Sequence, residues 1–162
     1  MGLLDKFKKK ETAQVLGAYM KGTCVGIREV PDPTFGEEIL GKGMAIIPTD
    51  GHVYAPADGV ISTIFPTGHA VGITTPSGAE LLIHIGLDTV ELKGGPFTIH
   101  VQAEQSVKKG DLLIEADLEK VKEAGKDIIT PLVVCNTDAY AQVELLAKGD
   151  VEAGEDVLKL VK

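Results

Sequence analysis

Short apolar runs separated by turn residues make up most of the chain from about residue 18 onward. Eight runs have the composition of β-strands: TCVGIREV (23–30), GMAIIP (43–48), HVYAPA (52–57), GVISTIF (59–65), AVGITTP (70–76), AELLIHIG (79–86), FTIHV (97–101) and DLLIEA (111–116). Between them stand clusters that favour tight turns, such as PDP, GKG, TDG, ADG, PSG and KGG. Short, evenly spaced strands without long helices between them predict an all-β domain, an antiparallel β-sandwich or barrel-like fold.

Two segments have helical features. DLEKVKEAG (117–125) starts with an aspartate suited to an N-cap and ends with a glycine suited to a C-cap. A shorter helix is expected to begin within AYAQVELL (139–146). The prediction is therefore one β-domain over residues 18–162, with many short strands and one or two short helices.

Residues 1–17 differ in composition and are predicted to form a tail before the domain. Leu3, Leu4 and Phe7 fall on one face of a short helix, and lysines at positions 6 and 8–10 make the remainder basic. The pattern fits a weak, reversible anchor on anionic lipid, and it equally fits a solvated tail. The residues leave both interpretations open.

The expected compartment follows from the apolar runs and the cysteines. No run approaches the roughly 18–20 apolar residues that span a bilayer, and MGLLDKFKKK lacks the apolar region of a secretion signal. Cys24 and Cys135 lie among apolar or small neighbours and are expected to be buried, free thiols. We therefore expect a cytoplasmic protein, peripheral to the inner face of the membrane if the tail binds lipid.

Composition and charge narrow the classes of function. The chain has 162 residues, 44% of them hydrophobic and 25% charged, which suits a single globular domain. Its formal net charge of −8 disfavours nucleic-acid binding and suits a basic protein partner. Because it has no tryptophan and only 4% aromatic residues, a platform for stacking bases is not expected.

Two of the four histidines are candidates for chemistry. His52 follows a turn, and His100 alternates with apolar residues, so both are expected on the solvent side without an assigned role. In an antiparallel hairpin, the position numbers of paired residues add up to about twice the position of the turn centre. A turn centred near 76–78 would therefore place His69 and His84, whose numbers add up to 153, nearly opposite each other. A slip of one residue in the register would undo this pairing.

A pair of neighbouring imidazoles fits three interpretations. A metal site usually needs three or four ligands, and Asp88 is the nearest additional candidate. Alternatively, one neutral ring attacks as a nucleophile while the other orients it or shares charge. The third interpretation is that His69 and His84 are both half-buried histidines with a structural role. Spacing alone does not choose among the three.

A longer motif around His84 resembles a known family. GAELLIHIGLDTVELKG (78–94) is similar to the phosphorylation-site signature of the glucose-family IIA proteins of the bacterial sugar phosphotransferase system. That signature has a glycine, two free positions, three apolar residues, the histidine, an apolar residue, a glycine, an apolar residue, a free position, a threonine and an apolar residue. Every slot is filled here. VPDPTFGEEILGKGMAIIPTDG, YAPADGVISTIFPTGHA, VKKGDLLIEADL and TPLVVCNTD resemble the same family in the same order, so the resemblance covers nearly all of 22–162.

The resemblance implies a phosphocarrier with an antiparallel β-sandwich fold. His84 matches the histidine that accepts a phosphoryl group from the phosphocarrier protein HPr and passes it to the IIB domain of a sugar permease. His69 matches a second histidine that assists the transfer, and Thr67 matches a threonine that hydrogen-bonds that second ring. No cofactor is required, and the sugar is bound by the permease. The resemblance also allows regulatory binding of transporters or metabolic enzymes, with a zinc ion shared by His69, His84 and the partner.

A nucleophile that serves two protein partners must be reachable. His84 is therefore expected in a shallow apolar depression, with an acidic rim that steers a basic partner. The candidate wall residues are Phe35, Ile39, Phe65, Leu82 and Val90, and the candidate rim residues are Asp32 and Asp88. Simple core packing is the competing explanation for the wall residues.

Two other functions remain as alternatives. Zinc-dependent β-sandwich peptidases also have short strands with a similar pattern of apolar residues and glycines. They need an HxH pair and an HxxxD pair, which this sequence lacks. Lipoyl- or biotin-carrier modules resemble VKKGDLLIEADL in texture, but the usual context of their modified lysine is absent.

Overall fold

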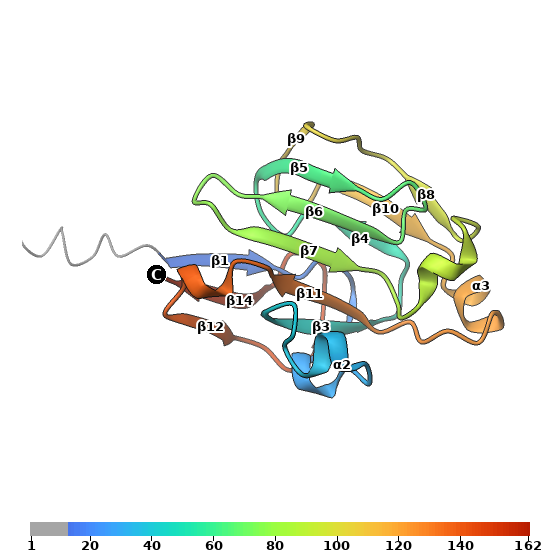
Figure 1. Cartoon of the computed structure of the whole chain (residues 1–162), viewed down its shortest axis with the longest axis horizontal. Helices are drawn as coiled ribbons and strands as arrows, with labels where there is room; N and C mark the ends of the chain where they lie inside the picture. The colour runs from blue at the N-terminus through green and yellow to red at the C-terminus, as the bar shows by residue number, and fades with distance from the viewer. Residues whose placement is uncertain (1–12) are drawn as a thin grey trace, which may run out of the picture.

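The computed structural model describes residues 13–162 and is built mainly of short antiparallel strands (Figure 1). The strands are β1 (Ala13–Gly17), β2 (Gly22–Gly26), β3 (Lys42–Pro48), β4 (His52–Tyr54), β5 (Gly59–Ile64), β6 (Ala70–Thr74), β7 (Glu80–His84), β8 (Phe97–Ile99), β9 (Ser106–Val107), β10 (Leu112–Ala116), β11 (Thr130–Val134), β12 (Gln142–Leu145), β13 (Gly149–Val151) and β14 (Asp156–Val161). The α-helices are α2 (Pro33–Gly36) and α3 (Leu118–Glu123). Three 3-10 turns complete the elements: η1 (Ile27–Glu29), η2 (Thr89–Leu92) and η3 (Thr137–Ala139). The predicted all-β antiparallel fold is confirmed.

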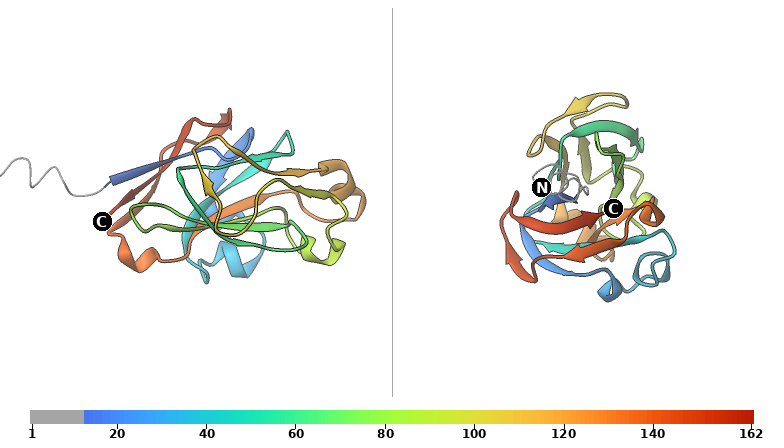
Figure 2. Two further views of the ribbon diagram at one scale, coloured as in Figure 1. Left: turned by 90° about the horizontal axis from the view of Figure 1, so that it is seen from above. Right: turned by 90° about the vertical axis from the view of Figure 1, so that its left-hand side faces the viewer.

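The strands form three sheets around a common apolar interior. The largest has the order β13-β2-β3-β11-β7-β6-β5-β9, and the two smaller ones have the orders β1-β14-β12 and β4-β10-β8. Turned views show strands on opposite sides of the interior (Figure 2). Because the sheets face one another, one side of most strands is buried and the other meets solvent.

The burial pattern along each strand follows its place in the sheet. All five residues of β11, in the middle of the large sheet, are buried, as a near-continuous apolar run predicts. In β7, Leu81 and Ile83 are buried, whereas Leu82 and His84 on the other face are half-buried. This alternation presents the His84 side chain outward from the large sheet.

Two expectations about the elements and one about a cysteine are corrected. The run 23–30 is a strand only to Gly26, after which η1 turns the chain. The segment 139–146 is not a helix: it contains β12, which pairs with β14 while Val143 and Leu145 pack on the core. Cys135 is exposed, whereas Cys24 is buried as predicted, and both are free. The predicted helix at 117–125 is confirmed as α3, with the Asp117 side chain as its N-cap.

The boundary drawn at residue 17 also moves. Residues 13–17 form β1, which pairs along β14 from Ala13 opposite Val161 to Gly17 opposite Asp156. The predicted tail therefore loses these five residues to the sheet, and its amphipathic part in residues 1–12 lies outside the described residues. Within residues 13–162, no helix is long and apolar enough to cross a membrane.

Candidate functional site

His84 is held by the backbone that follows its own strand. It is the last residue of β7, and its Nδ1 lies 2.8 Å from the carbonyl oxygen of Gly86. A carbonyl only accepts hydrogen bonds, so Nδ1 must carry the proton and donate it. In the neutral ring this leaves Nε2 with a free lone pair, so Nε2 is the ring atom that is available to act as a nucleophile.

His69 is positioned by the turn that precedes β6. Gly68 has a φ of +76°, and its N–H donates to the carbonyl oxygen of Phe65 at 2.7 Å, which closes the turn. His69 follows directly and is only 4% exposed. Its Nδ1 is hydrogen-bonded to the hydroxyl of Thr67. The bond from Thr67 predicted by the resemblance is present, and it leaves Nε2 of His69 for another partner.

The two rings lie side by side. Their centroids are 5.0 Å apart, and the planes are nearly perpendicular at 78°. The strand register differs by one residue from the prediction, because His84 pairs with Ala70 and not with His69. His69 lies just outside the ladder, where its carbonyl accepts from Ile85 N–H at 2.7 Å, and this bond keeps the two segments together. The predicted proximity is therefore confirmed, by a different pairing.

Burial keeps both imidazoles neutral. Desolvation, and then the neighbouring His84, lower the pKa of His69 from 6.5 to about 4. Desolvation also lowers the pKa of His84, although the bond to Gly86 and the charges of Asp32 and Asp88 act in the opposite direction. Near neutral pH, both rings are therefore unprotonated at one nitrogen, as nucleophilic attack requires.

Aromatic side chains border the pair on two sides. The Phe35 ring, at the first turn of α2, lies 5.1 Å from the His84 ring, and the Phe65 ring lies 5.1 Å from the His69 ring. Phe35 is 5% exposed and packs in a small core beneath η1, whereas Phe65 is 37% exposed. The structure thus brings both predicted aromatic residues to the histidines, and only Phe65 offers substantial exposed surface.

The other predicted partner-binding residues are less uniform. Leu82 shares a strand face with His84, and Asp88 and Val90 follow at the start of η2, where Val90 is 50% exposed. Ile39 is 68% exposed and lines a groove with Leu40 and Cys135, and neither histidine is among the residues lining that groove. The placement of Ile39 therefore does not support the expectation that it borders His84.

The histidine pair fits only part of a zinc centre. Among residues 13–162, no group of three or more His, Cys, Asp or Glu side chains is arranged to hold a metal. Thr67 and Gly86 occupy the two Nδ1 atoms, so His69 and His84 offer one Nε2 each. A tetrahedral zinc site needs further ligands, and the predicted shared site would have to take them from a partner.

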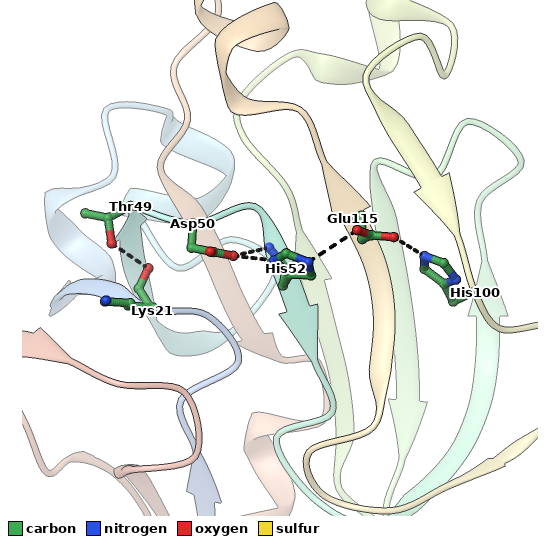
Figure 3. Close-up of polar contacts among 6 residues, drawn as sticks. All are labelled: Lys21, Thr49, Asp50, His52, His100 and Glu115. Carbon is green, nitrogen blue, oxygen red and sulfur yellow. Dashed lines mark hydrogen bonds and ion pairs between the residues drawn. The ribbon is translucent and has the colours of Figure 1, made fainter.

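The remaining histidines form a separate polar chain on the sheet β4-β10-β8 (Figure 3). His52 Nδ1 lies 2.5 Å from Asp50, and its Nε2 lies 3.2 Å from Glu115. Glu115 in turn lies 2.5 Å from His100 Nε2. Both histidines are partly exposed, which agrees with their expected solvent-side position.

Two threonines that the sequence reasoning missed also reach the site. Thr89 and Thr130 are 0% exposed, and their hydroxyls bond to the backbone on either side of the Ile85–Gly86 peptide. Thr89 was visible as a slot of the motif, but no spacing rule connects Thr130, more than forty positions downstream, to Gly86.

Comparison with known families decides the assignment. Residues 14–140, which include both histidines, match the model of the family described as phosphoenolpyruvate-dependent sugar phosphotransferase system, EIIA 1. The chain belongs to this family. The EIIA assignment makes it a component of a sugar-uptake system that works by phosphoryl transfer, and it favours neither the peptidase nor the carrier-module alternative.

Individual EIIA relatives agree over most of the chain. The glucose-specific EIIA component of Halalkalibacterium halodurans is 50% identical over 98% of this chain and 94% of its own length. A β-glucoside-specific EIIBCA component of the same organism is 45% identical over 91% of the chain, which spans only 23% of that longer protein. The solved structure of glucose permease IIA from Mycoplasma capricolum has a TM-score of 0.85 at 38% identity, covering 91% of this chain and 96% of that one.

Proposed function

We propose that this EIIA chain carries a phosphoryl group on Nε2 of His84, receiving it from HPr and passing it to the IIB domain of a glucose-type sugar permease. The observation that carries the proposal is the bond from His84 Nδ1–H to the carbonyl of Gly86, which fixes the tautomer with Nε2 free. A relative in which EIIA is fused to IIB supports the choice of acceptor.

The transfer needs positioning and charge stabilisation more than covalent chemistry. The bond between phosphorus and HPr breaks as the bond between phosphorus and His84 Nε2 forms. The His84 ring keeps its Nδ1 proton throughout. In the second transfer the Nε2–phosphorus bond breaks and the neutral ring is restored. Because one ring nitrogen serves both steps, donor and acceptor must use the same face in turn.

His69 is suited to stabilise the phosphoryl group. Its ring centroid is 5.0 Å from that of His84. When the Thr67 hydroxyl donates to His69 Nδ1, the proton of the neutral His69 ring is on Nε2, from which it can donate to a phosphoryl oxygen. The arriving negative charge raises the pKa of His69 and strengthens this bond. His69 thereby assists the transfer without becoming phosphorylated.

The surroundings suit protein partners. Phe65 has exposed surface beside His69, and Val90 has exposed surface in η2, which follows His84. Asp88 adds negative charge before η2. A partner with a basic, partly apolar face would be steered to this site. The relay needs no cofactor and would operate on the cytoplasmic side, where the IIB domain is expected. A zinc ion shared with a regulatory partner stays a prediction.

The test is a phosphotransfer assay with variants. Wild type, His84→Gln, His69→Gln and the control His52→Gln are incubated with enzyme I, HPr and labelled phosphoenolpyruvate, and then with a purified IIB domain. We expect acid-labile label on all except His84→Gln, and slow discharge to IIB from His69→Gln alone. An unlabelled wild type in the presence of labelled HPr would overturn the proposal.

A further inference from the structure

Two fully buried hydroxyls lie at the loop that follows His84. Thr89 and Thr130 are 0% exposed, and burying a hydroxyl is costly unless it is hydrogen-bonded. Thr89 Oγ1 donates to the carbonyl oxygen of Ile85 at 2.5 Å. The N–H of Gly86 donates to Thr130 Oγ1 at 3.4 Å, and Thr130 Oγ1 itself donates to the Ile128 carbonyl at 2.9 Å. Both hydroxyls therefore form hydrogen bonds with backbone groups that follow His84 closely in the chain.

These two bonds hold one peptide unit from both edges. The carbonyl of Ile85 and the N–H of Gly86 belong to the same planar group, whose orientation is a single variable. Thr89 binds one edge of that plane and Thr130 binds the opposite edge. Rotation of the plane would break both bonds inside the protein, where neither hydroxyl has access to water.

The next peptide unit holds His84. Its carbonyl, that of Gly86, accepts from His84 Nδ1, and its N–H, that of Leu87, donates to the carbonyl oxygen of Asp127 at 3.0 Å. The two planes meet at the α-carbon of Gly86, where φ is +72°. Glycine adopts many other φ values at little cost. The direction of the Gly86 carbonyl thus depends on what fixes the plane before it as well as the plane after it.

Thr130 is itself firmly placed. It is the first residue of β11, opposite Ile46 of β3 in the middle of the large sheet. Its carbonyl accepts from the hydroxyl of Tyr19 at 2.7 Å, and Tyr19 is 0% exposed. The hydroxyl that binds Gly86 therefore projects from one of the most buried parts of the molecule.

We propose that Thr89 and Thr130 are positioning residues for His84: they clamp the Ile85–Gly86 peptide so that the Gly86 carbonyl faces Nδ1 and the ring stays in the tautomer with Nε2 free. The inference deepens the proposed function and rests on it for its catalytic meaning. Thr89 and Thr130, which lie outside the histidine pair, thereby contribute to the reactivity of His84.

The first readout does not depend on any partner protein. Long-range ¹H–¹⁵N spectra of the unphosphorylated protein near pH 7.5 report which ring nitrogen of His84 carries the proton. In wild type we expect the proton on Nδ1. In Thr89→Val and Thr130→Val, which keep the shape but remove the hydroxyl, the two nitrogen shifts should move toward each other as both tautomers become populated. Thr89→Ser and Thr130→Ser should restore the wild-type spectrum.

The second readout is the rate of phosphoryl acceptance from phospho-HPr. The valine variants should be slower by roughly tenfold, as expected from a misplaced reacting group, and the serine variants should recover. The matched control is Thr75→Val. Thr75 is 3% exposed, and its hydroxyl bonds to Gln14 and the Ala79 N–H, so its loss should lower stability without changing the His84 spectrum.

The outcomes separate the two proposals. Folded valine variants with wild-type His84 shifts would overturn the clamp and leave the relay untouched. A wild type that phospho-HPr does not label would overturn the relay, whatever the ring spectra show. If a valine variant does not fold, Thr89→Cys or Thr130→Cys replaces it at the same position, since a thiol is both a weaker donor and a weaker acceptor. A smaller shift of the same sign supports the clamp, and an unchanged spectrum contradicts it.

Discussion

At the scale of single residues, the pKa of His69 has a consequence for stability. Burial and His84 lower it from 6.5 to about 4, so between these values the unfolded chain binds a proton that the folded chain excludes. Stability is therefore lost as the pH falls through this range. From about pH 7.5 to about pH 5, His69 should account for a loss on the order of 2 kcal/mol.

Urea unfolding at both pH values checks this in wild type and His69→Gln. The variant lacks the titrating ring, so it should lose less stability on acidification than wild type. His84 is present in both proteins, and the loss of its repulsion with a protonated His69 only adds to the difference between them. Equal losses in the two proteins would show that the buried ring of His69 does not resist protonation.

Gly86 has no room for a side chain. A Cβ added there would lie 2.7 Å from Thr89 Cγ2 and 2.8 Å from the Asp127 carbonyl oxygen, at a φ of +72°. Gly78 provides the control, because its φ is +94° and no atom lies within 4 Å of the added Cβ. Gly78→Ala should cost about 1 kcal/mol from backbone strain alone, and Gly86→Ala should cost clearly more in chemical denaturation. Equal costs would mean that the Gly86 contacts relax freely.

The residues of the site were only partly predictable. His84, His69 and Thr67 stand in a motif whose letters can be read directly. The carbonyl that accepts from His84 Nδ1 could not be named from the sequence, because its direction depends on a φ angle at Gly86 that no letter specifies. The hydroxyl bonds of Thr89 and Thr130 depend on loops far apart in sequence, so they emerge only from the three-dimensional structure.

At the scale of elements, α3 depends on its N-terminal cap. The Asp117 side chain accepts from the Lys120 N–H at 3.2 Å, and Val121 is the buried residue of this six-residue helix. Asp117→Ala should lower the free energy of unfolding by about 1 kcal/mol. Glu119→Ala is the control, because its exposed ion pair with Lys122 at 3.6 Å should contribute within about 0.5 kcal/mol. Thermal unfolding compares the two, and similar losses would argue against a capping role.

The elements also show where pattern reasoning works and where it fails. The cap and final glycine located α3 well, because both signals are local. The segment 139–146 has no such cap, and its alternate positions, Val143 and Leu145, face the core with the two-residue period of a strand. In the hairpin of β6 and β7 the register could be predicted only to within one residue. The reason is that the geometry of the turn, and not its length alone, fixes which residues pair.

At the scale of the whole molecule, one hydroxyl joins distant parts of the chain. Tyr19 follows β1, and its hydroxyl donates to the Thr130 carbonyl, 111 positions away. Since both groups are buried, Tyr19→Phe should cost about 1–2 kcal/mol. Tyr54→Phe, at a half-buried position in β4, is the control and should cost less. A Tyr19→Phe variant as stable as wild type in urea would show that this bond contributes nothing net.

The overall architecture could be predicted because many weak signals agree. Short apolar runs, frequent turns and the absence of long helical patterns all favour sheets, and the three antiparallel sheets follow from them. The strand order within the sheets could not be predicted. Neighbours such as β11 and β7 are about fifty residues apart, and their pairing depends on total burial and not on local sequence.

The proposed relay depends on phosphorylation of His84 at Nε2. The most direct measurement is ³¹P–¹⁵N NMR of ring-labelled protein after incubation with phosphoenolpyruvate, enzyme I and HPr. We expect coupling of phosphorus to Nε2 of His84, with the Nδ1 proton still bonded to the Gly86 carbonyl. Phosphorus on Nδ1 of His84, or on either nitrogen of His69, would contradict it.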